Sequence, residues 1–336
     1  MKQVVRARRG SGRIIALIIN LALIGVAAGA YFNREFILDS LALLNYTPPT
    51  EVTALAKDDT MTALAQRYLY ASHPTVDDRT TFNTNCKNND EQTIVLGCYS
   101  NRQLHIFDVS DQRLHGVKQV TLAHETLHAA YQRLSPSERA RVNIMIERQV
   151  QITGPQNEHI QGLINVYNRT EPGELDNEMH SILGTEVRDL NPELEVYYKQ
   201  YFDNRGQIAG YADQYQAIFT SLRTQQTGLV GDLNALAATV NSRSAALNAA
   251  LSQLNDDVSA FNRRASSNQF ASQAEFDAAR AQLIVQQQQL SDERSAIQSL
   301  IAEYNDKRQQ LQSLNLEAQS LNTSIDSLLA PVPTVQ

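Results

Sequence analysis

The chain contains one long apolar segment close to its beginning. Residues 14–32 read IIALIINLALIGVAAGAYF, where Asn20 is the single strongly polar side chain. A helix of this length spans about 28 Å, which is close to the hydrocarbon thickness of a bilayer. The pattern therefore predicts a membrane-spanning helix within residues 1–33. A signal peptide that is cleaved near Ala30 is the alternative interpretation.

The next 170 or so residues alternate between short β-type runs and helical periodicity. A helix is expected over residues 61–69, capped by Asp59 or Thr60. The β-branched and aromatic runs at 93–99 and 102–109 predict a hairpin. Capping residues and Gly-Pro punctuation then predict a series of helices, at residues 116–133, 137–152, 156–169, 174–189 and 192–203. Residues 47–203 are thus expected to form one small α+β domain.

From residue 204 the pattern changes to that of a coiled coil. Apolar positions recur in steps of three, four and seven over residues 204–262 and again over 273–329, with a polar joint between the two stretches. The two stretches are nearly equal in length, which predicts an antiparallel helical hairpin over residues 204–330. This hairpin could self-associate, bind a coiled-coil partner or regulate the preceding domain. The fold class predicted for the whole chain is mainly α.

The charge distribution suggests where the chain is located. Residues 1–13 carry five positive side chains and no acid, although the 336 residues together have a net charge of −7. Positive residues beside a membrane span stay in the cytoplasm, so everything after residue 33 is expected outside. The remaining chain is acidic, which argues against nucleic acid as a partner, since phosphate binding needs clustered Lys and Arg.

An extracytoplasmic location affects the interpretation of the two cysteines. Cys86 and Cys98 are the only cysteines in the sequence. Outside the cytoplasm they are candidates for a disulfide, which would stabilise the fold by about 3 kcal/mol for a loop of this size. Two free, buried thiols are the alternative.

The candidate chemistry lies in the segment His124-Glu125-Thr126-Leu127-His128. Two histidines four residues apart share one helix face, so both imidazoles can reach a single Zn²⁺. Glu125 follows the first histidine, where its carboxylate can accept a proton from an activated water. Residues 120–131 carry no other charge, as expected of a buried helix. An ordinary pair of histidines is the alternative.

A catalytic zinc needs a third protein ligand, and the residues directly after His128 offer none. Residues 174–186 are the best source, and Glu178, Glu174 and His180 are all candidates there. The string Asn177 to Ser181, followed by Gly184-Thr185, resembles the second zinc-binding helix of thermolysin-like peptidases.

Together with the first motif, this string makes residues 90–190 similar to a gluzincin, a zinc metallopeptidase with an HExxH helix and a later glutamate ligand. The resemblance implies that His124 and His128 are ligands, Glu125 is the general base and Glu178 is the third ligand. It also implies that an edge strand within 93–109 pairs with extended substrate. The family has an Asp where this chain has Ile182, so the partner of a zinc histidine is unassigned; Glu174 and Glu186 are candidates.

These features predict a membrane-anchored, extracytoplasmic zinc peptidase that acts on peptides or proteins. Further candidates for donors to a developing oxyanion are His159, Tyr131, Tyr167 and Tyr197. The alternatives are a non-catalytic envelope scaffold built on the coiled coil and a hydrolase of cell-wall peptides. Glu125 weighs against the scaffold, because a purely structural zinc site has no need of that carboxylate.

Overall fold

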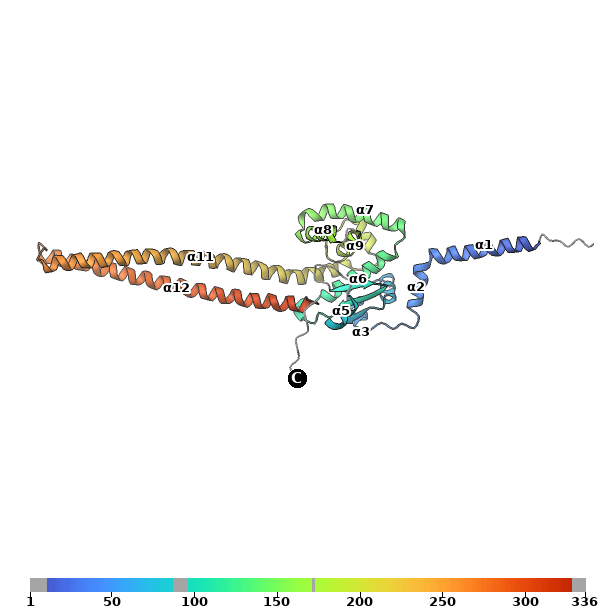
Figure 1. The fold of residues 1–336 in the computed structure, drawn as a ribbon, viewed down its shortest axis with the longest axis horizontal. Coiled ribbons are helices and arrows are strands. Elements are labelled where there is room, and N and C mark those ends of the chain that lie inside the picture. Colours follow the sequence, from blue (N-terminus) through green and yellow to red (C-terminus); the bar gives the residue numbers. More distant parts are fainter. Residues whose placement is uncertain (1–10, 87–95, 171–172, 328–336) are drawn as a thin grey trace, which may run out of the picture. The chain divides into compact units, whose positions relative to one another are not determined.

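The computed structural model describes residues 11–86, 96–170 and 173–327, which are mainly helical with one small sheet (Figure 1). The chain divides into two compact units. Unit 1 comprises Met1–Gln216 together with Thr323–Gln336, and unit 2 comprises Ala217–Asn322. The prediction of a mainly α protein with a small β component is confirmed.

Unit 1 contains most of the shorter helices. They are α1 (Ser11–Phe32), α2 (Arg34–Ala42), α3 (Thr50–Asp58), α4 (Ala63–Ala71), α5 (Arg79–Asn85), α6 (Val117–Arg133), α7 (Pro136–Thr153), α8 (Glu158–Thr170), α9 (Leu175–Thr185) and α10 (Pro192–Tyr198), with short 3-10 helices at Gln112–Leu114 and Gly154–Gln156. The helix expected at 61–69 begins later than predicted: Thr62, not Asp59 or Thr60, caps it by accepting a hydrogen bond from the Ala65 N–H.

Helix α9 is shorter than the predicted 174–189 and ends at Thr185, and Arg205 binds the segment that follows it. The buried Arg205 guanidinium donates hydrogen bonds to the carbonyl oxygens of Val187 and Arg188, each at 2.6 Å. These bonds hold the non-helical backbone that directly follows α9. The predicted 192–203 helix likewise ends early, at Tyr198, where the chain turns to begin α11 (Arg205–Ser266).

A three-stranded sheet of order β1-β3-β2 lies within unit 1. The predicted hairpin is confirmed as β2 (Gly97–Ser100) antiparallel to β3 (Gln103–Phe107), although residues 93–95 of its predicted first strand lie outside the described residues. The third strand, β1 (Thr75–Asp77), pairs parallel with β3 and was not predicted. Because β3 is central, β2 is an edge strand.

The predicted disulfide is present. Cys86 is bonded to Cys98, with their Cα atoms 6.0 Å apart. Cys86 directly follows α5, and Cys98 lies within β2. The bridge therefore fixes the position of the edge strand relative to α5.

Helix α6 runs through the core of unit 1. Its buried side chains include Leu122, Ala123, Leu127 and Ala130, which are all fully inaccessible to solvent. They pack in one hydrophobic cluster with residues of α3, α4, α7 and α9. The segment 120–131, which carries no charge outside the motif, is thus largely buried, as its composition predicted.

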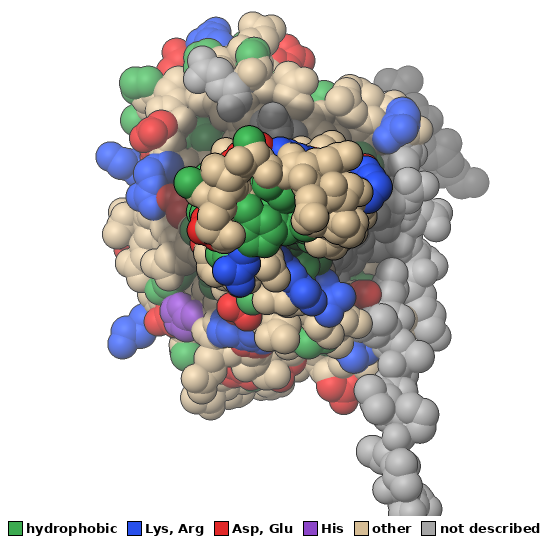
Figure 2. Space-filling model, turned by 90° about the vertical axis from the view of Figure 1, so that its left-hand side faces the viewer, with side chains coloured by type: hydrophobic (Ala, Val, Ile, Leu, Met, Phe, Trp, Pro, Cys, Tyr) green, Lys and Arg blue, Asp and Glu red, His purple; other side chains and the backbone are tan. Residues whose placement is uncertain are grey.

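Unit 2 is the predicted antiparallel helical hairpin. Within it α11 and α12 (Gln273–Ile325) are joined by ion pairs, Arg243 with Glu293 at 2.6 Å and Lys307 with Asp232 at 2.8 Å. At the turn, the rings of Phe261, Phe270 and Phe276 cluster with centroids 5.0–5.3 Å apart. Figure 2 faces this end of the hairpin and shows hydrophobic side chains gathered there beside basic ones.

The apolar segment near the beginning of the chain forms α1, and its large side chains are exposed. Over the residues whose side chains are described, no single helix is long and apolar enough to cross a bilayer alone. The segments Ala16–Phe32 and Arg34–Ala42 reach that length and composition only together, with a bend of 68° between them.

Candidate metal centre

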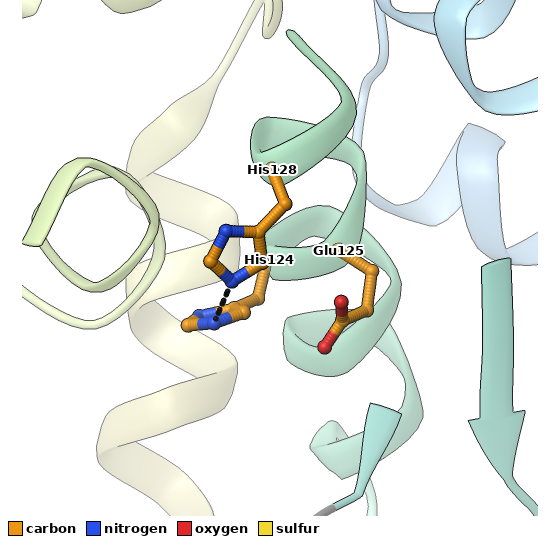
Figure 3. Close-up of side chains that lie close together, drawn as sticks. All are labelled: His124, Glu125 and His128. Atoms are coloured by element: carbon orange, nitrogen blue, oxygen red, sulfur yellow. Dashed lines mark hydrogen bonds between the residues drawn. The ribbon is translucent and has the colours of Figure 1, made fainter. Parts of the chain in front are cut away.

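Two imidazoles on α6 face each other (Figure 3). The Nε2 atoms of His124 and His128 lie 3.0 Å apart, because residues four apart stand one above the other on a helix. Their side chains retain 17% and 14% exposure. The pair can therefore be reached from solvent, although it lies on a largely buried helix.

Glu178 of α9 completes a three-residue cluster. Its Oε1 lies 3.3 Å from His124 Nε2, and its Oε2 lies 3.4 Å from His128 Nε2. Ligand atoms that bind one zinc tetrahedrally at about 2.0–2.1 Å would be roughly 3.3–3.4 Å from one another. The two Nε2 atoms are 3.0 Å apart, and each lies 3.3 or 3.4 Å from a different oxygen of Glu178, so the carboxylate faces both histidines at about that spacing. The donor set and its spacing thus fit a zinc ion.

A glycine brings α9 close enough to α6 for this contact. A Cβ at Gly184 would lie 2.4 Å from the Leu127 Cδ1 and 2.9 Å from a ring carbon of Tyr198. Such distances are far shorter than van der Waals contact, so a larger residue would push the helices apart. Gly184 therefore sets the separation at which Glu178 reaches the histidines.

Asn177 is the hydrogen-bond partner that the sequence analysis left unassigned. Its Oδ1 lies 3.0 Å from His128 Nδ1, so that nitrogen donates a proton and Nε2 is left free to bind a metal. The Asn177 Nδ2 in turn donates to Glu174 Oε2 at 3.1 Å. Glu174 thus supports the site indirectly. Glu186, the other candidate, accepts a hydrogen bond from Gln216 instead.

His180 does not point toward the cluster. Its Nε2 is hydrogen-bonded to the Tyr197 hydroxyl at 2.8 Å, and its ring is fully buried beside Tyr131, Tyr197, Tyr198 and Tyr201. Burial, reinforced by the charges of His128 and His124, lowers the pKa of His180 to about 3. Of the three candidates for the third ligand, only Glu178 approaches both histidines.

The candidate oxyanion donors are engaged elsewhere or are buried. The Tyr131 hydroxyl donates to Asn143 Oδ1 at 2.8 Å, and Tyr197 contacts His180. Tyr167 is 5% exposed. The side chain of His159 lies outside the described residues.

Glu125 lies to one side of the two imidazoles on the same helix and does not bridge them (Figure 3). One of its carboxylate oxygens still lies within 4.8 Å of a ring nitrogen of both histidines. A Cβ at Gly97 of β2 would lie only 2.6 Å from Glu125 Oε1, so the carboxylate packs directly against the edge strand. This close approach was not anticipated from the sequence, because glycine at one strand position carries no local signal of what lies opposite.

The electrostatics of the cluster favour a bound cation. Burial disfavours a charged imidazole, but the Glu178 carboxylate outweighs burial and raises the pKa of His128 to about 10; the pKa of His124 is also raised. Burial likewise opposes ionisation of Glu178, yet the two histidines hold the pKa of Glu178 well below its usual range. Burial raises the pKa of Glu125. Without a metal, both imidazoles are therefore protonated more readily than usual, and a divalent cation would replace those protons.

No protein-family model, no curated protein and no solved structure matches this chain. The chemical interpretation of the site therefore rests on the geometry of this chain alone. Two imidazoles and a carboxylate converge, a second carboxylate lies beside them, and an edge strand lies next to that second carboxylate.

Proposed function

We propose that this protein is a membrane-anchored zinc peptidase of the gluzincin type, which hydrolyses peptide bonds outside the cytoplasm. The observation that carries the proposal is the placement of Glu178, whose two oxygens lie 3.3 and 3.4 Å from His124 Nε2 and His128 Nε2. Sequence spacing alone can pair the two histidines. A carboxylate from a separate helix at ligand distance supports a metal site independently of that spacing.

His124, His128 and Glu178 would hold the zinc, with Asn177 orienting His128 through its Nδ1–H. Zinc bound there would supply Lewis-acid activation of a carbonyl group and of a water molecule. Three protein ligands leave a fourth position open, which is typical of catalytic sites and not of structural ones. This supports an enzyme more than a scaffold.

Glu125 would act as the general base. The residue is 5% exposed, and its carboxylate lies near the histidines without bridging them, so it can take a proton from water and deliver it to the leaving amine. Its burial raises its pKa, which favours holding that proton between the two transfers.

The substrate would bind along β2. Among the described residues, this strand pairs only with β3, so its other edge has backbone groups for an extended peptide. Gly97 places that edge directly beside the Glu125 carboxylate. A scissile bond aligned with β2 would therefore lie close to the general base.

The membrane part of the proposal is based on α1. Its apolar side chains are exposed, and residues 1–13, which include its first turn, carry five basic residues. Lipid would cover the apolar helix, and the basic residues would hold the N-terminus in the cytoplasm.

The test compares zinc content and casein cleavage of the full chain in detergent with those of Glu125→Gln. We expect both proteins to bind about one zinc per chain, and Glu125→Gln to cleave at least about a hundredfold more slowly, because general-base catalysis contributes that much or more. Glu147→Gln, the same change at an exposed position on α7, serves as the control and should retain full activity.

The outcomes separate the alternatives. Zinc in a folded parent that cleaves neither casein nor cell-wall peptides would favour the envelope scaffold. Cleavage of cell-wall peptides alone would favour the wall hydrolase. Absence of zinc from folded protein would rule out the metal centre.

A further inference from the structure

Helix α2 has its polarity reversed relative to an ordinary surface helix. Its acidic residues face the body of unit 1: Asp39 is 1% exposed and Glu35 is partly buried. Its outward face, continued by Leu44, is made of large apolar side chains: Phe36, Ile37, Leu38, Leu41 and Leu44 are between 40% and 69% exposed. A helix in contact with water normally buries its apolar stripe and exposes its charges.

Ion pairs fix this reversed orientation. The Arg133 guanidinium donates to both carboxylate oxygens of Asp39, at 2.7 and 3.0 Å, and Arg102 pairs with both Asp39 and Glu35. Arg133 and Asp39 each retain only 2% side-chain exposure. Separating one of these charges from its partners inside the protein would be costly, so α2 cannot rotate to hide its apolar face.

A second set of contacts holds a neighbouring side of α2. Arg67 of α4 donates to the Phe36 carbonyl at 3.2 Å and to Ser40 Oγ at 2.8 Å. Its guanidinium also lies 4.3 Å from the centre of the Phe36 ring. The apolar face is therefore presented outward by a rigid attachment and not by a loose segment.

The neighbouring helix indicates what covers this face. Residue 33 alone separates α2 from the apolar α1, and the two helices meet at a bend of 68°. A nine-residue helix extends only about 14 Å, too short to cross the hydrocarbon layer. A short helix that is apolar on one face and continues a membrane segment at an angle suits the interface between headgroups and acyl chains.

Basic residues beside the apolar face fit the same environment. Arg34 begins α2 and is largely exposed, and Arg67 lies against Phe36. Guanidinium groups bind phosphate through paired hydrogen bonds, so these side chains suit lipid headgroups.

We propose that α2 is an interfacial helix that fixes unit 1 against the lipid surface. This inference rests on the membrane anchor in the proposed function, but not on the peptidase chemistry. Arg133 is the last residue of α6, and His128 lies about 8 Å before it along the same helix. The clamp on Asp39 would thus hold the metal cluster at a fixed, short distance from the membrane attachment.

The absence of tryptophan from the sequence allows a direct test. Leu41→Trp is introduced into the full chain, which is reconstituted in phosphatidylcholine–phosphatidylglycerol vesicles with and without brominated acyl chains. Leu23→Trp in α1 reports on the anchor. Ile144→Trp in α7 is the matched control, since Ile144 and Leu41 are apolar side chains with 56% and 62% exposure. Leu44→Trp repeats the measurement if Leu41→Trp fails to fold.

We expect blue-shifted emission from Leu41→Trp and at least about twofold quenching by brominated lipid, since an interfacial helix buries its apolar face ~5–10 Å into the acyl boundary. Ile144→Trp should be unaffected. Quenching of Leu23→Trp alone would overturn the proposal while leaving the anchor intact, and no quenching at either position would also remove the anchor. A blue shift without quenching would mean that protein covers α2, which overturns the proposal. Equal quenching at Ile144 would indicate non-specific adsorption and would do the same.

Discussion

Asn177 shows how a residue that binds no metal itself can determine how well a metal is held. It accepts the Nδ1 proton of His128 and is anchored by Glu174. We expect Asn177→Ala to weaken zinc binding by about 10–100-fold, because loss of the partner frees the imidazole to rotate and to change tautomer. Competition with a chromogenic chelator measures the affinity.

Asn165→Ala, an exposed site on α8, is the control and should bind zinc as the parent does. An unchanged affinity in Asn177→Ala would show that the ring of His128 is fixed by packing alone.

Zinc affinity should also rise with pH. In the metal-free protein the pKa of His128 is raised to about 10, so its imidazole carries a proton at neutral pH, and zinc must displace that proton. Below that pKa, zinc affinity rises about tenfold per pH unit for each proton that binding releases. Glu178 adds no dependence there, because its pKa is held below its usual range. Apparent zinc dissociation constants between pH 6 and 8 measure this slope, and a flat profile would contradict the assigned charge state.

For individual site residues, the sequence predicts those contacts that residue spacing along one helix fixes. His124 and His128 are one helical turn apart, so their convergence follows from the helix alone. Glu178 required a second helix at the right distance, which was supplied by resemblance to a family and not by spacing. The role of Asn177 depends on the angle between α6 and α9, which no local pattern encodes.

At the scale of elements, the packing of β2 on α6 makes a specific prediction for Gly97. A Cβ there would lie 2.6–2.7 Å from side-chain atoms of Glu125 and Thr121, so Gly97→Ala must displace the strand or the carboxylate. We expect a loss of about 1–3 kcal/mol of stability from overpacking. Cleavage should fall while zinc is retained, because the atoms nearest the added Cβ belong to Glu125 and Thr121 and not to His124, His128 or Glu178.

Gly162→Ala on α8 is the matched control, since nothing lies within 4 Å of its added Cβ. Thermal unfolding, zinc content and casein cleavage of both variants provide the comparison. Full activity in Gly97→Ala would show that the strand yields without moving Glu125.

Strand β1 and helix α2 are not predicted from the sequence, for the same physical reason. Strand β1 has three residues, and its pairing joins Thr75 to His105, some thirty residues away. A strand that short gains its stability from its neighbour and not from its own pattern. The sequence does not predict helix α2, because its buried acidic positions are explained only by Arg102 and Arg133, which lie against it in the fold.

At the scale of the whole molecule, the chain returns to unit 1 after the hairpin. Arg79 donates to the Thr323 carbonyl at 3.0 Å, Asn83 donates to the Ser327 carbonyl, and Ile325 is buried. Truncation after Asn322 should therefore lower the stability of unit 1 by about 1.5–3 kcal/mol, the value of one large buried apolar side chain. Truncation after Ser327 keeps these contacts and should leave the unfolding temperature unchanged. Equal melting of the two truncated proteins would contradict this role.

The heptad pattern predicted the hairpin and its antiparallel course, because steps of three and four are a local signal. It placed the end of the coiled coil at residue 330, whereas unit 1 already resumes at Thr323. Helix α12 continues to Ile325, and the contacts of Thr323 and Ser327 with α5 and of Ser324 with Asp111 are not encoded in its heptad pattern.

Unit 1 is built from two separate segments of the chain, so it can be completed only late in synthesis. The segment carrying the candidate metal centre leaves the ribosome well before Thr323, and about a hundred further residues must be made in between. At ~5–20 residues per second, that interval lasts roughly 5–20 s. Throughout it, the nascent domain lacks its final contacts on α5, so a chain released early would carry a complete set of ligands in an incomplete fold.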